Sequence, residues 1–267
     1  MGNRTNTLPP SRQRLATVLR AGRETVSIGA AARALGTDRN EAARILSRWS
    51  RQGWLTRVGP GLYAPVPLEL AGNEQVLADP WVLVPALFGK CYIGGWTAAH
   101  HWDLTEQLFN ETVVFTTRRI VKKRVTSQGA VFLLHNIPEK RLFGLKNEWR
   151  GSAKVSVSDP ARTIVDLLAM PDAGGGIDHV ADCLAGYFQR KDADRALVIR
   201  YAEQFRNGAV FKRLGFLADT RLHDKALAAA CGSRLTQGYA DLDPHLAKDH
   251  LVTTWRLWVP AHWVGKP

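Results

Sequence analysis

Cysteine is scarce in this sequence, and long apolar runs are absent. The three cysteines are far apart and include no C-x-x-C pair, so a disulfide framework and a thiolate zinc site are both unfavoured. They are Cys91, Cys183 and Cys231. The most apolar stretch, residues 81–96, is interrupted by a proline, a glycine and a lysine and is too short to span a bilayer. Residues 1–14 are polar and do not resemble a signal peptide. These absences predict a soluble protein of the reducing cytoplasm.

Lysine is missing from the first quarter of the chain, and acids are rare there. Residues 1–68 hold eleven arginines and three acids, so they carry a formal charge of +8 out of +12 for all 267 residues. Arginine suits bidentate contacts to phosphates and bases better than lysine does. A basic balance of this size indicates an anionic partner such as nucleic acid. The hydrophobic fraction of 45% argues against a disordered protein.

Residues 26–63 have the pattern of two short helices followed by a hairpin. Apolar residues recur twice at positions i, i+3, i+4 and i+7, which gives each helix one apolar face. The two sets are Ile28, Ala31, Ala32 and Leu35, then Ala42, Ile45, Leu46 and Trp49. Asp38 and Glu41 resemble a capping box at the start of the second helix. Two such helices joined by a short turn predict a helix-turn-helix. Residues 54–58 and 62–65 predict a small hairpin, or wing, directly after it.

The second predicted helix has a polar face opposite its apolar stripe. Asn40, Arg44 and Ser47 lie on this face, and these residue types contact base edges in the major groove. A solvated basic helix face is the alternative, but the wing that follows favours DNA recognition. We therefore predict base contacts from these three residues and phosphate contacts from the basic residues around them. The full predicted set in this unit is Arg39, Asn40, Arg44, Ser47, Arg48, Arg51 and Arg57.

Pro65 and Pro67 mark an expected boundary between residues 1–67, a winged helix-turn-helix DNA-binding domain, and residues 68–267. Few core contacts are expected to cross it. The second domain is expected to be larger and mixed, with a small sheet and several helices, so the predicted fold class is α+β. Strands are expected at 91–95, 112–117, 130–135 and 154–157, and a closing strand over 253–263; helices are expected at 96–102, from Pro160, and from Gly176 onward.

A run of five bases interleaved with two apolar residues lies between two expected strands of the second domain. The bases are Arg118, Arg119, Lys122, Lys123 and Arg124. One interpretation is an exposed hairpin whose charges discourage pairing between sheet edges. The other is an additional phosphate-binding site that extends the DNA contact, and on that interpretation the five residues belong to the predicted DNA-binding set.

Several segments in a fixed order resemble one protein family. They are the winged unit ending in Gly61-Leu62-Tyr63, YIGGWTAAHHWDL from Tyr92, SDPARTIVDLL at 158–168 and FKRLGFLAD at 211–219. In this order they are similar to the AbiEi-type antitoxins, transcriptional regulators of type IV toxin–antitoxin systems associated with abortive phage infection. The resemblance implies a repressor that binds inverted repeats at its own promoter. It also implies an antitoxin whose partner is a nucleotidyltransferase-like toxin countered without a stable complex, with antitoxicity in the second domain.

Catalytic motifs are weak. Gly232-Ser233 followed by Asp241 and Asp243 has the outline of a nucleotidyltransferase metal site, but the spacing is short and a third carboxylate is not evident. We expect no catalytic residues, no metal site and no cofactor. Two alternatives stay open: a winged-helix regulator whose second domain senses a small molecule and has no toxin partner, and, more remotely, a DNA-directed enzyme.

Overall fold

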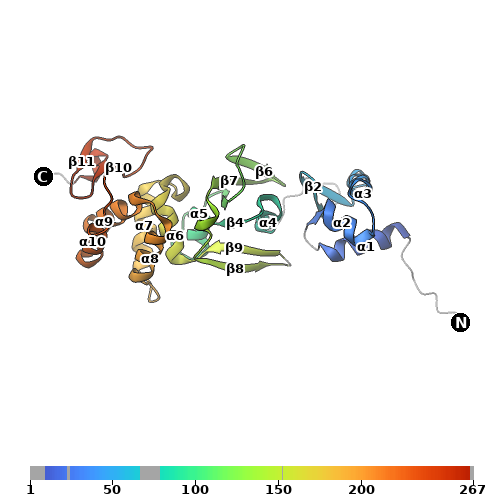
Figure 1. The fold of residues 1–267 in the computed structure, drawn as a ribbon, viewed down its shortest axis with the longest axis horizontal. Coiled ribbons are helices and arrows are strands. Elements are labelled where there is room, and N and C mark those ends of the chain that lie inside the picture. Colours follow the sequence, from blue (N-terminus) through green and yellow to red (C-terminus); the bar gives the residue numbers. More distant parts are fainter. Residues whose placement is uncertain (1–9, 23–24, 67–78, 152, 265–267) are drawn as a thin grey trace.

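The computed structural model describes residues 10–22, 25–66, 79–151 and 153–264. The molecule is elongated, with the N-terminal unit at one end, a mixed sheet in the middle and a helical layer with a small C-terminal sheet at the other end (Figure 1). Helices and mixed sheets therefore make an α+β fold, as the sequence predicts.

The N-terminal unit contains three helices and a three-stranded antiparallel sheet of order β1-β3-β2. Its elements are α1 (Pro10–Ala21), β1 (Val26–Ser27), α2 (Ile28–Leu35), α3 (Arg39–Arg51), β2 (Leu55–Gly59) and β3 (Leu62–Pro65). The α2–α3 turn is short because Gly36 takes a left-handed conformation (φ +64°) and Asp38 accepts hydrogen bonds from the amides of Asn40 and Glu41. Both predicted apolar stripes face the core, where Leu46 and Trp49 are almost completely buried.

The central unit is built on a six-stranded sheet of order β6-β7-β5-β4-β9-β8. Its strands are β4 (Cys91–Ile93), β5 (Glu111–Thr116), β6 (Arg124–Ser127), β7 (Ala130–Asn136), β8 (Leu145–Arg150) and β9 (Ala153–Ser158). The pairs β4–β9 and β5–β7 are parallel and the others antiparallel. The accompanying helices are η2 (Pro80–Leu83), α4 (Val84–Phe88), α5 (Gly95–His101) and η3 (Glu139–Arg141). The four strands predicted here are confirmed, and β6 and β8 are additional.

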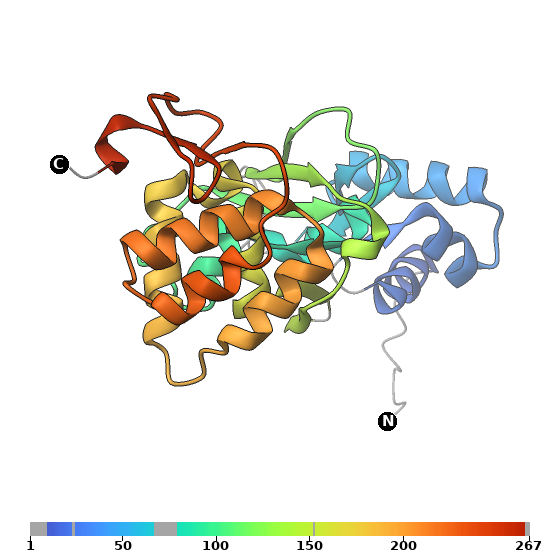
Figure 2. The same cartoon turned by 60° about the vertical axis from the view of Figure 1, so that its left-hand side comes forward.

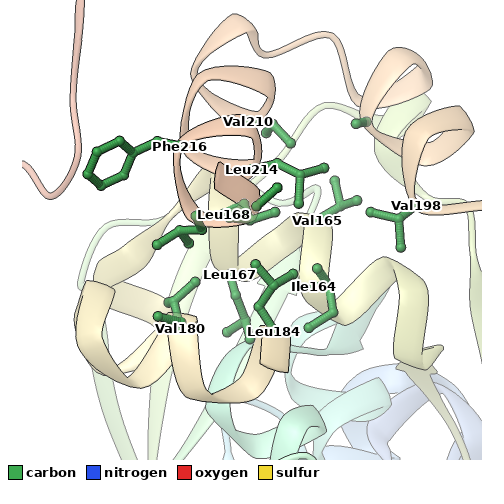
Figure 3. Packing of buried hydrophobic residues seen from close by; sticks show 14 of the residues in the cluster. Ile164, Val165, Leu167, Leu168, Val180, Leu184, Val198, Val210, Leu214 and Phe216 are labelled. Carbon is green, nitrogen blue, oxygen red and sulfur yellow. The ribbon is translucent and has the colours of Figure 1, made fainter. Parts of the chain in front are cut away.

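A helical layer packs on α6, whose residues are all buried after Pro160. Its elements are α6 (Pro160–Ala169), η4 (Pro171–Gly174), α7 (Ile177–Gln189), α8 (Arg195–Phe205), α9 (Gly208–Thr220) and α10 (Lys225–Gly232). Ile164, Leu168 and Leu214 lie in its apolar core (Figure 3). As predicted, Asp159 caps α6 by accepting a hydrogen bond from the amide of Arg162, and Pro160 occupies the first turn.

The C-terminal region differs from its prediction. A single closing strand was expected over 253–263, but these residues form a turn, the short strand β12 (Leu257–Val259) and η5 (Ala261–Trp263), and β12 pairs with β10 (Ala240–Asp241) and β11 (His250–Val252). Thr253–Arg256 is a turn in which Arg256 has φ +52°. The turn forms because Trp255 packs into the helical core and its indole N–H donates to Asp219 (3.3 Å). Burial of one tryptophan therefore overrides the alternation that predicted a strand.

The N-terminal unit packs against the central sheet through its β2–β3 hairpin. Val58, Leu62 and Ala64 share one buried cluster with residues of η2, α4 and four central strands. Three hairpin residues thus share a buried cluster with the central unit, and the division into two domains stays a prediction. The predicted boundary itself, between residues 67 and 68, lies outside the described residues.

Candidate nucleic-acid interface

All the predicted recognition residues of α3 are exposed. The apolar stripe of α3 is buried, and the opposite face carries Arg39, Asn40, Arg44, Ser47, Arg48 and Arg51. From Asn40 to Arg51 this face extends along the helix for about 16 Å, at about 1.5 Å per residue. An α-helix of this length fits the major groove and passes about five base pairs at about 3.4 Å each. The geometry thus allows base edges and flanking phosphates to be contacted from one helix face.

The charge around α3 is almost entirely positive. Glu41 is the one acid within α3, and its carboxylate lies 3.8 Å from the guanidinium of Arg14. The Arg39 guanidinium reaches across to the first turn of α2, where it lies 3.4 Å from the position that a Cβ would occupy on Gly29. Arg33 of α2 approaches the same position at 3.9 Å and is exposed. Sequence reasoning missed Arg33, although it lies outside the apolar stripe of α2 and the same periodicity argument identifies it.

The β2–β3 hairpin is fixed in place by the central sheet. The Ser127 hydroxyl donates to the carbonyl of Val58 (2.6 Å), and the Gln128 side-chain amide donates to the carbonyl of Arg57 (3.4 Å). The Arg57 side chain stays exposed, and its Nε donates to the carbonyl of Gly59 (3.4 Å). The hairpin therefore presents Arg57 from a rigid position beside α3, and not from a loose tip.

The basic run 118–124 forms the connection from β5 into the first residue of β6, and its five bases are all exposed. Arg118 donates to the carbonyl of Leu87 (3.1 Å), and Arg124 forms an ion pair with Glu111. Val121, in the middle of the run, is 92% exposed. The run is an exposed loop that leads into the edge strand β6, and it is not a hairpin, because β7 lies between β5 and β6 in the sheet. Its role in discouraging edge pairing and its phosphate-binding role both stay predictions.

A chain of contacts links this loop to the β2–β3 hairpin. Arg118 is bonded to Leu87 of α4, and the Leu87 side chain lies 2.6 Å from the position that a Cβ would occupy on Gly59. The loop also lies on the same side of the molecule as α3 (Figures 1 and 2). Whether the exposed bases of both units contact one nucleic acid stays a prediction.

A cavity of about 340 Å³ lies under the same loop. Phe88, Val125 and Leu134 line its apolar part, while Arg118, Arg119 and Lys122 lie at the same cavity. Its size is at the low end of the range for small-molecule pockets. Most of its lining surface is apolar, with the basic side chains at the surface loop.

The SDPAR motif serves packing and not a surface site. Arg162 is completely buried, and its guanidinium donates to Asp166 (3.0 Å), to the Tyr92 hydroxyl (2.7 Å) and to the carbonyls of Arg141 and Phe143 (2.9 and 2.8 Å). Burial raises the pKa of Tyr92 well above its usual value, and the neighbouring Asp166 raises it further. This network joins α6 to β4 and to the segment before β8.

The aspartates of the suspected nucleotidyltransferase motif serve structural roles. Asp243 is buried and accepts hydrogen bonds from the amides of Ile177 (3.0 Å) and His245 (2.9 Å), so it caps α7. Asp241 pairs with Lys248 (2.8 Å). Among the residues that the structure describes, no group of three or more His, Cys, Asp or Glu side chains is placed to hold a metal ion.

Comparisons with known proteins bear on the first unit most directly. Residues 13–66 match the family model of the AbiEi antitoxin, a transcriptional regulator. The predicted resemblance is confirmed for this AbiEi-type segment, which contains α2, α3 and the β2–β3 hairpin and nearly all of α1. Every predicted DNA-binding residue from Arg39 to Arg57 lies inside it. A search of curated proteins finds no match to the chain.

A solved structure has the same fold over most of the molecule. The crystal structure of the RV2827C protein from Mycobacterium tuberculosis covers 95% of this chain and 92% of its own, with a TM-score of 0.60 and 16% sequence identity. At this identity the likeness concerns the fold alone. In the described part of the present chain, no helix is long and apolar enough to cross a membrane.

Proposed function

We propose that this protein is a DNA-binding transcriptional repressor whose residues 1–67 form a winged helix-turn-helix. In this proposal α2 and α3 are the helix-turn-helix, α3 is the recognition helix, and the β2–β3 hairpin is the wing. One observation carries the proposal: the polar face of α3, from Asn40 to Arg51, is exposed and carries Arg44, Arg48 and Arg51, with Glu41 at its edge as the one acid of the helix, while the opposite face is core. Asn40, Arg44 and Ser47 read bases, and Arg39, Arg48, Arg51 and Arg57 contact phosphates.

We further propose that the protein is an antitoxin of the type IV class and represses its own operon. The AbiEi-type segment supports both roles at the level of the family. The partner is then a nucleotidyltransferase-like toxin encoded beside it and countered without a stable complex. Residues 68–267 carry the antitoxicity, without catalysis. In cells that meet phage, such a pair contributes to abortive infection.

Repression is tested by a reporter fused to the DNA upstream of the gene. Wild-type protein is expected to silence the reporter, and Arg44→Ala to lose most of that repression, because loss of one good base contact costs about 1–3 kcal/mol. Arg200→Ala is the matched control: it removes an exposed arginine on α8, far from α3, and should repress like wild type. Equal repression by Arg44→Ala and wild type would contradict the assignment of α3.

The two roles are separated with the same full-length variants. Truncation at residue 68 is a poor test, because it removes Val58, Leu62 and Ala64 from a core shared with the central sheet. Arg44→Ala keeps that core intact. It should still restore growth to cells expressing the neighbouring toxin, although it no longer represses. If Arg44→Ala fails to restore growth at wild-type protein levels, antitoxicity depends on DNA binding and the division is wrong.

The second candidate is a ligand-responsive regulator without a toxin partner. The cavity under the loop at 118–122 favours it, because Leu87 lines the cavity and also contacts the wing at Gly59. A ligand there has a direct route to the wing position. Two results together would support this candidate over the antitoxin. They are the absence of a nucleotidyltransferase gene next to this one and a small molecule that releases the protein from its operator.

A further inference from the structure

The outer edge of β8 is unpaired among the described strands and unusually open. The strand is the last in the six-stranded sheet, with β9 on one side only, and it borders the sheet in Figure 1. Lys146 and Asn147 are exposed, and Trp149 is 67% exposed. Soluble proteins usually protect such an edge, because its free main-chain groups bind another strand readily. A six-residue edge bearing a large exposed aromatic side chain therefore calls for a partner.

The main-chain groups that face outward can be assigned. The carbonyl of Gly144 accepts a hydrogen bond from the amide of Asp159 (2.9 Å), so position 144 faces β9. In an antiparallel ladder the bonded positions alternate along the strand. The N–H and C=O groups of Leu145, Asn147 and Trp149 consequently point away from β9, toward the free edge.

The side chains of β8 divide between the two faces of the sheet. On one face, Lys146 lies over the ring of Trp102 (4.9 Å) and the Glu148 carboxylate lies 3.8 Å from Nε2 of His101. Because successive residues alternate, Leu145 and Trp149 lie on the other face, and Leu145 packs against the cluster that contains Tyr92. Each face of the strand thus carries a distinct pair: opposite charges on one, and apolar groups on the other.

A second copy of β8 complements this edge in one register. A twofold axis perpendicular to the sheet and passing by Asn147 puts Lys146 opposite the partner's Glu148, and Leu145 opposite the partner's Trp149. Each contact occurs twice by symmetry. Centring the pair on Glu148 or on Lys146 puts that charge opposite its own copy, which is unfavourable. In the favoured register Asn147 faces its own copy, and all outward main-chain groups find partners.

We propose that the protein forms a twofold-symmetric dimer in which two β8 strands pair antiparallel, centred on Asn147. The two six-stranded sheets then become one continuous sheet, and the free edge disappears. The proposal does not rest on the proposed function, since it concerns β8 of the central sheet and not α3. It has a consequence for that function, because twofold-related α3 helices match the symmetry of an inverted repeat.

Charge reversal tests the register. Lys146→Glu puts two like-charged pairs across the interface, and so does Glu148→Lys; each should raise the dimer dissociation constant about tenfold or more. An equimolar mixture of the two variants should dimerise again, because the carboxylate introduced at position 146 of one chain then faces the ammonium introduced at position 148 of the other. Sedimentation velocity over a concentration series measures the mass directly. Lys191→Glu, the same change on an exposed loop, is the matched control and should dimerise like wild type.

Circular dichroism checks that each variant is folded before its mass is compared. The expected pattern is a dimer for wild type, the control and the mixture, and a monomer for each single variant at the same concentration. A monomeric wild type at all concentrations overturns the proposal. Dimerisation of the single variants with wild-type affinity also overturns it, because it locates the interface elsewhere. A mixture that stays monomeric rejects this register.

Discussion

Replacing Arg162 by alanine should destabilise the protein severely without changing its affinity for DNA. The guanidinium is fully buried and donates to Asp166, Tyr92 and two main-chain carbonyls. Arg162→Ala leaves Asp166 with the Tyr92 hydroxyl alone and leaves both carbonyls without this donor. Breaking a buried ion pair by removing one partner costs about 3–5 kcal/mol. Since whole domains are stable by about 5–15 kcal/mol, this is a large fraction of the total.

The double variant Arg162→Met with Asp166→Leu sharpens this test. It removes both charges together and fills their volume with apolar atoms, so it should be more stable than Arg162→Ala. The two carbonyls still lose a donor, which costs about 1–3 kcal/mol. Urea unfolding followed by tryptophan fluorescence gives the free energies of unfolding, and the Asp166→Leu single variant completes the cycle. A loss below about 1 kcal/mol for Arg162→Ala would refute the reasoning about the buried pair. Weakened DNA binding by the folded variant would refute the purely structural role.

Two other perturbations follow from the structure. Changing Lys122 and Lys123 to Gln should weaken operator binding without altering the protected sequence, and it should reduce the slope of log affinity against log salt by about two. The same change at Lys191 and Lys225 should have no effect. An unchanged isotherm at low salt would leave protection of the sheet edge as the only role of the two lysines. The ring of His135 stacks on that of Phe115, with 5.2 Å between the ring centroids. Burial lowers the pKa of His135; the charge of Asp172 raises this pKa, and the charge of Lys123 lowers it. The stability that the neutral ring contributes is present above the ordinary pKa of 6.5 and is lost as the pH falls through the lowered pKa. His135→Phe should therefore lose less stability than wild type between about pH 7 and pH 5 in urea titrations, and an identical loss in both proteins would contradict this source of acid sensitivity.

The spacing of apolar and capping residues predicted those helices and strands that are specified by their own side chains. The stripes of α2 and α3, the apolar strands β5 and β7 and the cap of α6 by Asp159 all lie where the pattern puts them. The strand β8 was missed because LKNEWR has little strand propensity of its own; it is a strand because six of its residues pair with β9. Tertiary pairing can override local preference in this way, and a local pattern does not show it.

The candidate site likewise has one part that the sequence predicts and one part that depends on long-range contacts. The exposed face of α3 follows from sequence alone, since a buried stripe fixes what lies opposite. The position of the wing does not, because it depends on Ser127 and Gln128, which are about seventy residues away from Val58 and Arg57 in the chain. Contacts of that separation leave no trace in a local pattern. The same holds for Arg118, which is linked to the β2–β3 hairpin through Leu87 of α4.

The central claim is that α3 and the wing bind DNA with separate base-reading and phosphate-binding residues. The direct measurement is the slope of log affinity against log salt, by fluorescence anisotropy with promoter DNA and a scrambled duplex. Arg57→Ala should reduce the slope by about one and weaken binding to both duplexes alike. Arg44→Ala should lose about 1–3 kcal/mol on promoter DNA and little on the scrambled duplex. If neither variant differs from wild type on either duplex, the exposed face of α3 is not the DNA-binding surface.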